Sequence, residues 1–349
     1  MPDDFIEEMT PILPGKSRMN VALIIFNRPH LTALVLQRIA LAKPDTLFVI
    51  ADGPRGDLSG DPELVRETRA VIDRVDWPCR VLKNYSDINM GCGIRPFSGI
   101  SWVFEQVDRC IILEDDCLPD PSFFRFCSEL LDRYENDMRV SMISGDNFIQ
   151  RTLPVKHDSY YASVYPLIWG WATWRRAWQN VDFELKEWPA LKETSWLRDY
   201  LRDELPARYW TARFNYVVGG KQRDIWDIAW VFACWRAGGM VIHPVVNLVR
   251  NIGWDAGATH TAEPVEDLIV RSQQMRFPLR HPAHLQIDKR ADRLMFEKIY
   301  SPPLGLWERL KWRHTYGIIV RKIPVVGRMW SWWRQSHAEM KTVNVKGDK

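Results

Sequence analysis

The stretch RCIILEDDCLPDPSFFRF, residues 109–126, places three acidic residues directly after a run of aliphatic ones. The aliphatic run has the length of a buried β-strand, so the strand would end on Glu114, Asp115 and Asp116. Adjacent carboxylates repel one another and resist burial, so a divalent cation or a shared proton is needed to hold them together. This stretch therefore predicts a charged site at the end of a buried strand.

The sequence on both sides of this stretch alternates strand-like and helix-like segments. The expected strands are 19–26, 46–52, 80–84, 109–114 and 139–144, and the expected helices are 27–40, 61–75, 97–107 and 121–134. Strands that alternate with amphipathic helices are typical of βαβ units. The pattern predicts an α/β fold with a doubly wound, mainly parallel sheet and helices on both faces.

The composition limits the classes of protein that fit. With 349 residues, 46% of them hydrophobic, the chain is long enough for a large globular core. The net charge of +3 gives no sign of a nucleic-acid binder. Six cysteines without a C-x-x-C pair indicate reduced thiols. An acidic N-terminus, with no apolar run near the roughly 20 residues that span a bilayer, predicts a cytoplasmic protein.

Polar side chains follow three of the expected strands. Asn27 and Arg28 follow the first, Asp52 follows the second, and the acidic cluster follows the strand at 109–114. Open α/β sheets bind ligands at the carboxyl ends of their strands. These residues suit a nucleotide, with Asp52 and Asn27 on the base and ribose and a metal ion on the diphosphate. Neither G-x-G-x-x-G nor G-x-x-x-x-G-K-[ST] occurs, so metal and arginine must bind the phosphates.

Asp116 is the expected ligand of Mg²⁺ or Mn²⁺, hard cations that prefer oxygen and bridge to phosphates. The alternative is that Asp116 only caps a helix and is solvated in the turn before Asp120. Alternation along a strand would place Glu114 and Asp116 on one side and Asp115 on the other, so the cluster can serve two purposes.

Four sequence segments together resemble the GT-A-fold, nucleotide-sugar-dependent glycosyltransferases. They are VALIIFNRP, a second strand ending in ADG, the loop NMGCGIRP, and IILEDDCLPDPSFFRF. The sequence is most similar to the bacterial family-2-like group and the N-acetylglucosaminyltransferase I family, where E-D-D takes the role of D-x-D. The resemblance is strong over 19–147 and extends to 261. It divides the chain into an N-terminal segment (1–18), a nucleotide-sugar-binding half (19–147), an acceptor-binding half (148–299) and a helical extension (300–349).

The resemblance implies roles for residues on the donor side. Asp116 would bind the metal, and Asp115 would lie near the ribose or a metal-bound water. Asp52 would contact the uracil or ribose, and Arg28 and Arg95 would lie near the base and phosphates. Glu114 belongs to the same nucleotide-binding group.

The resemblance also implies residues from the second half of the chain. A late histidine often completes the metal site, and His260 in ATHT is the candidate, although a lone histidine is more often structural. An inverting enzyme needs a carboxylate that deprotonates the acceptor hydroxyl, and RDIWDIAWVF offers Asp224 and Asp227. We expect Asp227 to be this base, because an acid in an apolar helical pattern is costly, and Asp224 to be an N-cap.

Tryptophans dominate the segment LIWGWATWRRAW. Their rings stack on the apolar faces of sugars, but large aromatic residues more often pack in a core. We assign Trp169 and Trp171 to the acceptor or donor sugar, whereas Trp174 and Trp178, four residues apart, fit packing.

The C-terminal extension, between residues 304 and 334, combines lysines and arginines with five tryptophans. This composition is typical of helices at a membrane interface, and the alternative is a helix pair that packs on the catalytic domain. We expect contact with an anionic membrane, which places the protein peripherally at the inner face of the cell membrane.

The sequence thus predicts a metal-dependent glycosyltransferase, a hexosyl- or N-acetylhexosaminyl-transferase, that uses Mn²⁺ or Mg²⁺. It would transfer a sugar, with inversion, from a UDP-linked donor to a glycan or lipid-linked acceptor in cell-surface polysaccharide synthesis. The alternatives are a nucleotidyltransferase of similar fold, whose glycine-rich first loop is missing here, and a non-catalytic carbohydrate-binding or membrane-adaptor protein.

Overall fold

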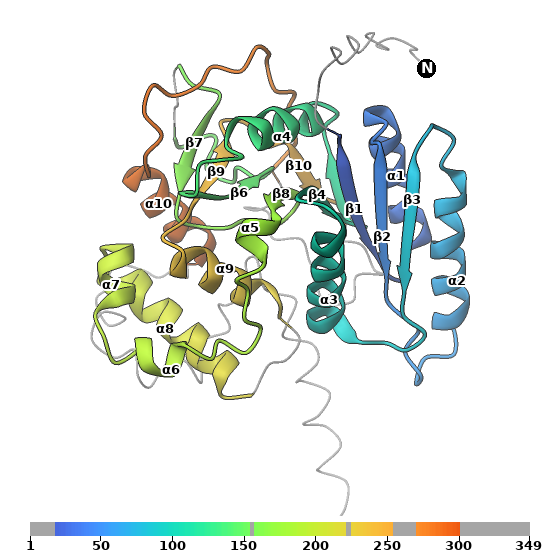
Figure 1. Ribbon diagram of the computed structural model, residues 1–349, viewed down its shortest axis with the longest axis horizontal. Coiled ribbons are helices and arrows are strands. Elements are labelled where there is room, and N and C mark those ends of the chain that lie inside the picture. The colour runs from blue at the N-terminus through green and yellow to red at the C-terminus, as the bar shows by residue number, and fades with distance from the viewer. Residues whose placement is uncertain (1–17, 154–156, 221–224, 254–269, 301–349) are drawn as a thin grey trace, which may run out of the picture.

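A computed structural model describes residues 18–153, 157–220, 225–253 and 270–300. Its centre is an eight-stranded sheet with the strand order β3-β2-β1-β4-β8-β6-β9-β7 (Figure 1). The strands are β1 (Asn20–Ile25), β2 (Thr46–Ala51), β3 (Arg80–Tyr85), β4 (Arg109–Glu114), β6 (Val140–Ser144), β7 (Tyr160–Ser163), β8 (Trp171–Trp174) and β9 (Met240–Pro244). A separate antiparallel pair joins β5 (Cys117–Pro119) to β10 (Val249–Asn251).

The sheet is mixed but mainly parallel, as the sequence predicts. Strands β3, β2, β1 and β4 are parallel neighbours, and so are β6 and β9. Strand β8 runs antiparallel between β4 and β6, and β7 runs antiparallel to β9. Because β8 comes from the second half of the chain, the sheet continues across residue 147 and joins both halves.

Helices cover both faces of the sheet, which confirms the predicted architecture (Figure 1). They are α1 (Pro29–Ala42), α2 (Asp61–Val71), α3 (Gly91–Gln106), α4 (Ser122–Arg133), α5 (Arg175–Trp178), α6 (Trp188–Leu191), α7 (Trp196–Leu201), α8 (Glu204–Val218), α9 (Asp227–Arg236) and α10 (Lys289–Met295). Alternate residues of β1 enter two cores: Val21 and Leu23 pack with α1, and Ala22 and Ile24 pack in the core shared with α3. Burial on both faces explains why β1 is a continuous apolar run.

Helix α3 begins at Gly91, six residues before the expected start. The sequence pattern could not reveal the earlier start, because it depends on a contact between residues far apart in sequence. The Asp52 carboxylate, at the end of β2, accepts hydrogen bonds from the backbone N–H groups of Met90 and Gly91, at 2.8 and 3.0 Å. These bonds satisfy amide groups that the start of a helix otherwise leaves without a partner.

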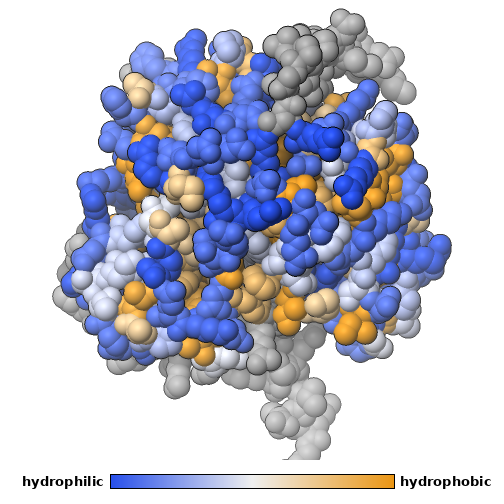
Figure 2. Space-filling view, viewed as in Figure 1, coloured by the Kyte–Doolittle hydropathy of each residue, from blue (hydrophilic) through white to orange (hydrophobic). Residues whose placement is uncertain are grey.

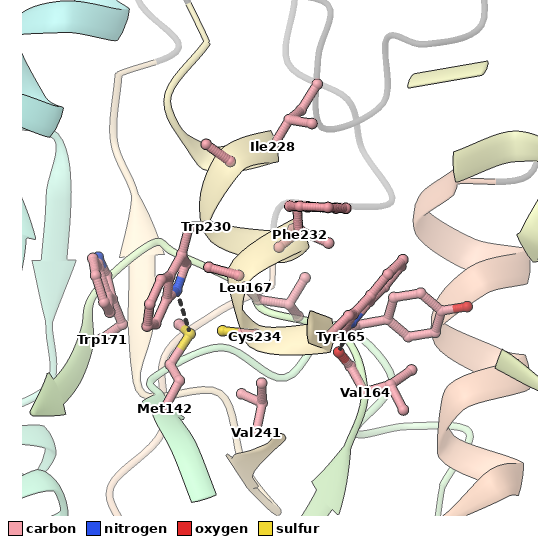
Figure 3. Close-up of a cluster of buried hydrophobic side chains, with 14 of the residues drawn as sticks. Met142, Val164, Tyr165, Leu167, Trp171, Ile228, Trp230, Phe232, Cys234 and Val241 are labelled. Atoms are coloured by element: carbon pink, nitrogen blue, oxygen red, sulfur yellow. Dashed lines mark hydrogen bonds between the residues drawn. The ribbon is translucent and has the colours of Figure 1, made fainter. Parts of the chain in front are cut away.

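Tryptophans of the second half form much of its core (Figure 3). The Trp230 indole on α9 donates a hydrogen bond to the sulfur of Met142 on β6, at 3.3 Å. Trp174 and Trp178 are 2% and 3% exposed, so the prediction that they pack is confirmed. Buried indoles combine a large apolar area with one N–H that needs a partner, and these contacts fix α9 against the sheet.

The surface in Figure 2 is largely hydrophilic, and its hydrophobic residues lie in small separate patches. Large hydrophobic side chains that are exposed include Leu34, Leu41, Leu58, Leu64, Ile88, Ile94, Met138 and Val218. None of the helices within the described ranges is both long and apolar enough to cross a bilayer. The six cysteines are free thiols, and four of them are buried.

Candidate active site

The acidic cluster lies at the carboxyl end of β4, in the middle of the sheet. Glu114 is the last residue of β4 and pairs with Ile24 of β1. Arg28, just beyond β1, donates a short hydrogen bond to Asp115, and its Nη1 lies 3.1 Å from Oδ2 of Asp116. One guanidinium group therefore joins two of the three acids.

Burial and mutual repulsion give these groups unusual proton affinities. Burial, together with the charges of Asp116 and Asp115, raises the pKa of Glu114 to about 8, while Arg28 opposes the rise. Burial alone would lower the pKa of Arg28, but the neighbouring carboxylates outweigh it and the pKa is raised. Three acids share one cation, so the cluster still favours a proton or a second cation.

The segment that contains β10 holds the cluster from the other side. The backbone N–H of Ile252 donates to the carbonyl of Asp116 at 2.8 Å, and Asn251 pairs with Cys117. A Cβ atom on Gly253 would lie 2.4 Å from Oδ2 of Asp116. Only glycine allows the backbone to pass so close to this carboxylate.

A metal ion at the acidic cluster would need ligands from the substrate and from water in addition to those from the protein. Among the residues described, no three or more His, Cys, Asp or Glu side chains are grouped so that they could hold a metal. The donor set at Asp116 is nevertheless oxygen only and lies in excess negative charge, which suits Mg²⁺ or Mn²⁺. Such ions are commonly bound by one or two carboxylates, with substrate phosphates and water as the other ligands. His260 lies outside the described residues.

Asp227 belongs to the same electrostatic site. It is the first residue of α9, and its side chain is half-buried. Burial raises its pKa to about 7, while the charge of Arg213 and the backbone N–H groups of Ile228 and Asp227 oppose the rise. The charge of Asp227 in turn raises the pKa of Glu114. A carboxylate with a pKa near neutrality has the proton affinity that general-base catalysis needs.

The N-cap position of α9 is occupied by Trp226. The expectation that Asp224 caps this helix is therefore wrong, because the helix begins two residues later than that cap requires. Asp224 itself lies outside the described residues.

Asp52 and Arg95 are largely occupied by other parts of the protein. Besides Met90 and Gly91, Asp52 accepts a hydrogen bond from the N–H of Gly53 at 2.9 Å. Buried Arg95 donates from Nε to the carbonyl of Ala51 at 3.1 Å and from Nη2 to Asn84. Both side chains join the ends of β2 and β3 to α3, so in this structure they shape the rim of the site.

Asn27 also has a partner within the protein. Its side-chain amide donates to Asp61 at 2.9 Å, and Asp61 is ion-paired with Arg55 at 2.5 Å. This network connects the end of β1 to the start of α2 at the nucleotide-facing edge that the sequence predicts.

The two tryptophans assigned to a sugar lie in different environments. Trp171 is 1% exposed and stacks on Trp226, with ring centroids 5.8 Å apart. Its ring is part of the core, so the expected sugar contact does not fit Trp171. The reason is its place inside β8, whereas Trp169 precedes the strand, is half-buried and packs edge-on against Phe148. Only Trp169 remains a candidate for stacking.

Asp146 is a site residue that the sequence reasoning missed. It follows β6 and is 0% exposed. Its Oδ2 accepts a hydrogen bond from the backbone N–H of Trp169 at 2.9 Å, and no described group bonds to its Oδ1. The signal was present, because ISGD places an acid just beyond an expected strand, as IAD does at Asp52.

Comparison with known proteins gives no family. No protein-family model and no curated protein matches this chain. Solved structures that resemble it weakly include the following two. One is a UDP-glucose pyrophosphorylase complexed with UDP-glucose, with 10% identity and a TM-score of 0.23, covering 42% of this chain and 62% of that one. The other is the mannosyltransferase PcManGT from Pyrobaculum calidifontis in complex with GDP-Man and Mn²⁺, with 11% identity and a TM-score of 0.35, covering 63% and 70%. At these scores the resemblance carries no argument about function.

Proposed function

We propose that this protein is a metal-dependent glycosyltransferase that moves a sugar from a nucleoside-diphosphate donor to a hydroxyl group of an acceptor. The observation that carries the proposal is the pairing of two acidic groups across one site. The cluster of Glu114, Asp115 and Asp116 lies at the end of the central strand β4, and the charge of Asp227 at the start of α9 raises the pKa of Glu114. A glycosyltransferase needs one acid to bind the metal and phosphates and a second acid nearby to act as the base.

The donor diphosphate would lie over the carboxyl ends of β1 and β4. There Arg28 offers a guanidinium group, which binds phosphate oxygens well. The base and ribose would extend toward the ends of β2 and β3, where Asn27, Asp52 and Arg95 shape the rim. We infer that the donor is UDP-linked from the sequence resemblance.

Asp116 would hold the metal ion, and Asp115 would be kept in place by Arg28. A bound Mg²⁺ or Mn²⁺ would neutralise charge that develops on the departing diphosphate. Asp115 has both Arg28 and the N–H of Phe26 as partners, whereas the half-buried Asp116 contacts Arg28 at one oxygen. Among the described groups, the other oxygen of Asp116 accepts only from the thiol of Cys117, a weak donor, at 3.5 Å, which favours Asp116 as the metal ligand.

Asp227 would remove the proton from the acceptor hydroxyl as that oxygen attacks the sugar. Its pKa of about 7 leaves a useful fraction ionised at neutral pH and still allows it to take a proton. Attack from the side opposite the diphosphate gives inversion. A glycan or lipid-linked acceptor, with membrane contact through residues 304–334, remains a prediction from sequence, and those residues lie outside the described structure.

The first test is thermal unfolding of the protein with a panel of nucleotide sugars and nucleoside triphosphates, each with Mn²⁺ or with a chelator. A ligand at 100 times its dissociation constant adds about 2.7 kcal/mol to the free energy of unfolding. We expect one nucleotide sugar to stabilise the protein only when metal is present. Product analysis then separates sugar transfer from the nucleotidyl transfer of the alternative enzyme. If no nucleotide shifts the transition, the proposal fails.

The substitution Asp116→Asn tests the metal site directly. We expect it to remove the metal-dependent stabilisation and to lower kcat/KM by about 100-fold or more, since a metal contributes several kcal/mol to charge stabilisation. Asp108→Asn is the matched control, because Asp108 lies at the opposite end of the same strand with a side chain that is 84% exposed. Equal metal dependence in the two variants would contradict the assignment.

A further inference from the structure

Asp146 lies in register with the acidic cluster. Strand β8 separates β4 from β6, and Trp171 of β8 pairs with Ile112 on one side and Ser144 on the other. Glu114 and Asp146 are each two residues beyond these partners, and Trp169 is two residues before Trp171. The three residues therefore lie at the same edge of the sheet, with Trp169 between the two acids.

The carboxyl group of Asp146 has an unfilled bonding position. Its Oδ2 is fixed by the N–H of Trp169, and its own N–H donates to the Ser144 hydroxyl oxygen at 3.1 Å. Its Oδ1 is buried without a partner among the described groups. A buried polar atom without a hydrogen-bond partner destabilises the folded protein by about 1–3 kcal/mol. A bound ligand that donates or accepts a hydrogen bond at Oδ1 would remove this cost.

The backbone connects Asp146 to the segment that holds the acidic cluster, because the N–H of Leu248, just before β10, donates to the carbonyl of the preceding Gly145 at 2.8 Å. The charge of Asp146 influences Cys117, the residue next to Asp116, and also Tyr300. Tyr300 is influenced by Asp227 as well. Burial raises the pKa of Asp146 well above its usual range, which favours the neutral form and gives the carboxyl a proton to donate.

We propose that Asp146 is a sugar-binding residue that hydrogen-bonds a hydroxyl group of the donor's sugar, next to the ring of Trp169. This inference rests on the proposed function. A pyranose presents hydroxyl groups at its edge and C–H groups on its faces, and a carboxyl beside an indole matches both. The backbone N–H of Trp169 holds the carboxyl in the orientation that the hydroxyl needs.

The donor's sugar, and not the acceptor, is the expected partner because of what flanks Asp146. Its charge acts on Cys117, which is adjacent to the metal-binding candidate Asp116, where the diphosphate would end. It also acts on Tyr300, on which the charge of the proposed base Asp227 acts as well. A sugar bonded to the diphosphate must lie between the group that binds the phosphates and the group that activates the acceptor.

The test compares binding of nucleotide sugars with binding of the bare nucleotides. Calorimetric titrations in Mn²⁺ would use UDP-glucose, UDP-N-acetylglucosamine and GDP-mannose beside UDP and GDP, for the native protein and Asp146→Asn. We expect the native protein to bind one nucleotide sugar more tightly than its nucleotide. The variant should lose at least about 10-fold in affinity for that sugar donor, while its affinity for the bare nucleotide changes less than twofold.

Asp292→Asn is the matched control. Asp292 is a half-buried carboxylate that accepts hydrogen bonds from Ser163 and from the N–H of Val164, at 2.6 and 3.1 Å. We expect this variant to keep the native preference for the sugar donor. Because each comparison is a ratio within one folded protein, partial loss of stability does not alter it.

Each other result has a distinct meaning. If Asp146→Asn keeps the preference for the sugar donor, or if both ligands weaken equally, Asp146 does not contact the sugar and the inference is overturned. If the native protein binds nucleotides without any preference for the sugar-linked form, the inference is likewise overturned. If the native protein binds no nucleotide at all, the proposed function itself fails.

Discussion

Asp52 and Asp146 both follow strands of the same sheet, but the protein uses their carboxyl groups differently. Asp52, in the first half of the chain, accepts three backbone hydrogen bonds. Asp146, in the second half, accepts one and leaves Oδ1 without a partner. In the first half Asp115 and Asp61 are likewise bound, by Arg28 and Arg55. The comparison separates an acid that holds the frame of the site, Asp52, from one that is free to bind a substrate group, Asp146.

The largest effect is expected from Asp227→Asn. If Asp227 removes the acceptor proton, this variant should lower kcat by about 100- to 10,000-fold and leave the dissociation constant of the donor nearly unchanged. Steady-state kinetics and calorimetry measure the two quantities. Glu204→Gln is the control, because Glu204 opens α8 as Asp227 opens α9 but is ion-paired with Arg208 at 2.7 Å. A loss of donor affinity equal to the loss of rate would argue against a base.

The pH dependence of stability should reveal the raised proton affinity of Asp227. The pKa of Asp227 is raised in the folded protein from an ordinary 3.8 to about 7. The folded state therefore binds more protons than the unfolded state between these values, and stability falls as pH rises from about 4 to 7. The slope for one such group is at most about 1.4 kcal/mol per pH unit.

Urea denaturation of the ligand-free protein at pH 5 and pH 8 measures this effect. Asp227→Asn should lose less stability over this interval than the native protein, whereas Asp108→Asn should follow the native curve. His243 acts in the opposite direction, because burial lowers its pKa to about 4. Its stabilisation is complete above about pH 6.5 and is lost as pH falls toward 4; it is common to all three proteins and cancels in the comparison. Parallel curves for the native protein and Asp227→Asn would show that Asp227 titrates normally.

The smallest effect on ligand binding is expected from Asp52→Asn. The amide group would turn an N–H toward one of the three backbone donors, so we expect a loss of about 1–3 kcal/mol in the free energy of unfolding. Donor affinity should change less than threefold, as calorimetry can show. Asp57→Asn, at an exposed position of the same loop, should change neither. A large loss of affinity at unchanged stability would mean that Asp52 binds the nucleotide directly.

Local patterns in the sequence were sufficient to predict the strands that the first half of the chain contributes to the sheet. Strands β1, β2 and β4 consist largely of apolar runs, and the helices between the strands carry clear periodicity, so the expected strand bounds differ from those observed by at most one residue. The acidic cluster was recognisable because three acids at the end of an apolar strand have no structural explanation by themselves. Arg28 was expected near the phosphates, but its bridge between Asp115 and Asp116 depends on the pairing of β1 with β4.

The pairing of strands that are distant in sequence decided the remaining features of the sheet and of the site. Strand β8 is only four residues long, and its sequence WATW does not reveal that it enters the sheet between β4 and β6. That insertion buries Trp171, brings Trp169 to Asp146, and places Asp146 level with Glu114. The sequence by itself determined the α/β class and the acidic strand end, because both follow from local polarity. Only the tertiary structure decided which acids have partners, because a hydrogen bond between residues distant in sequence exists only once the sheet has formed.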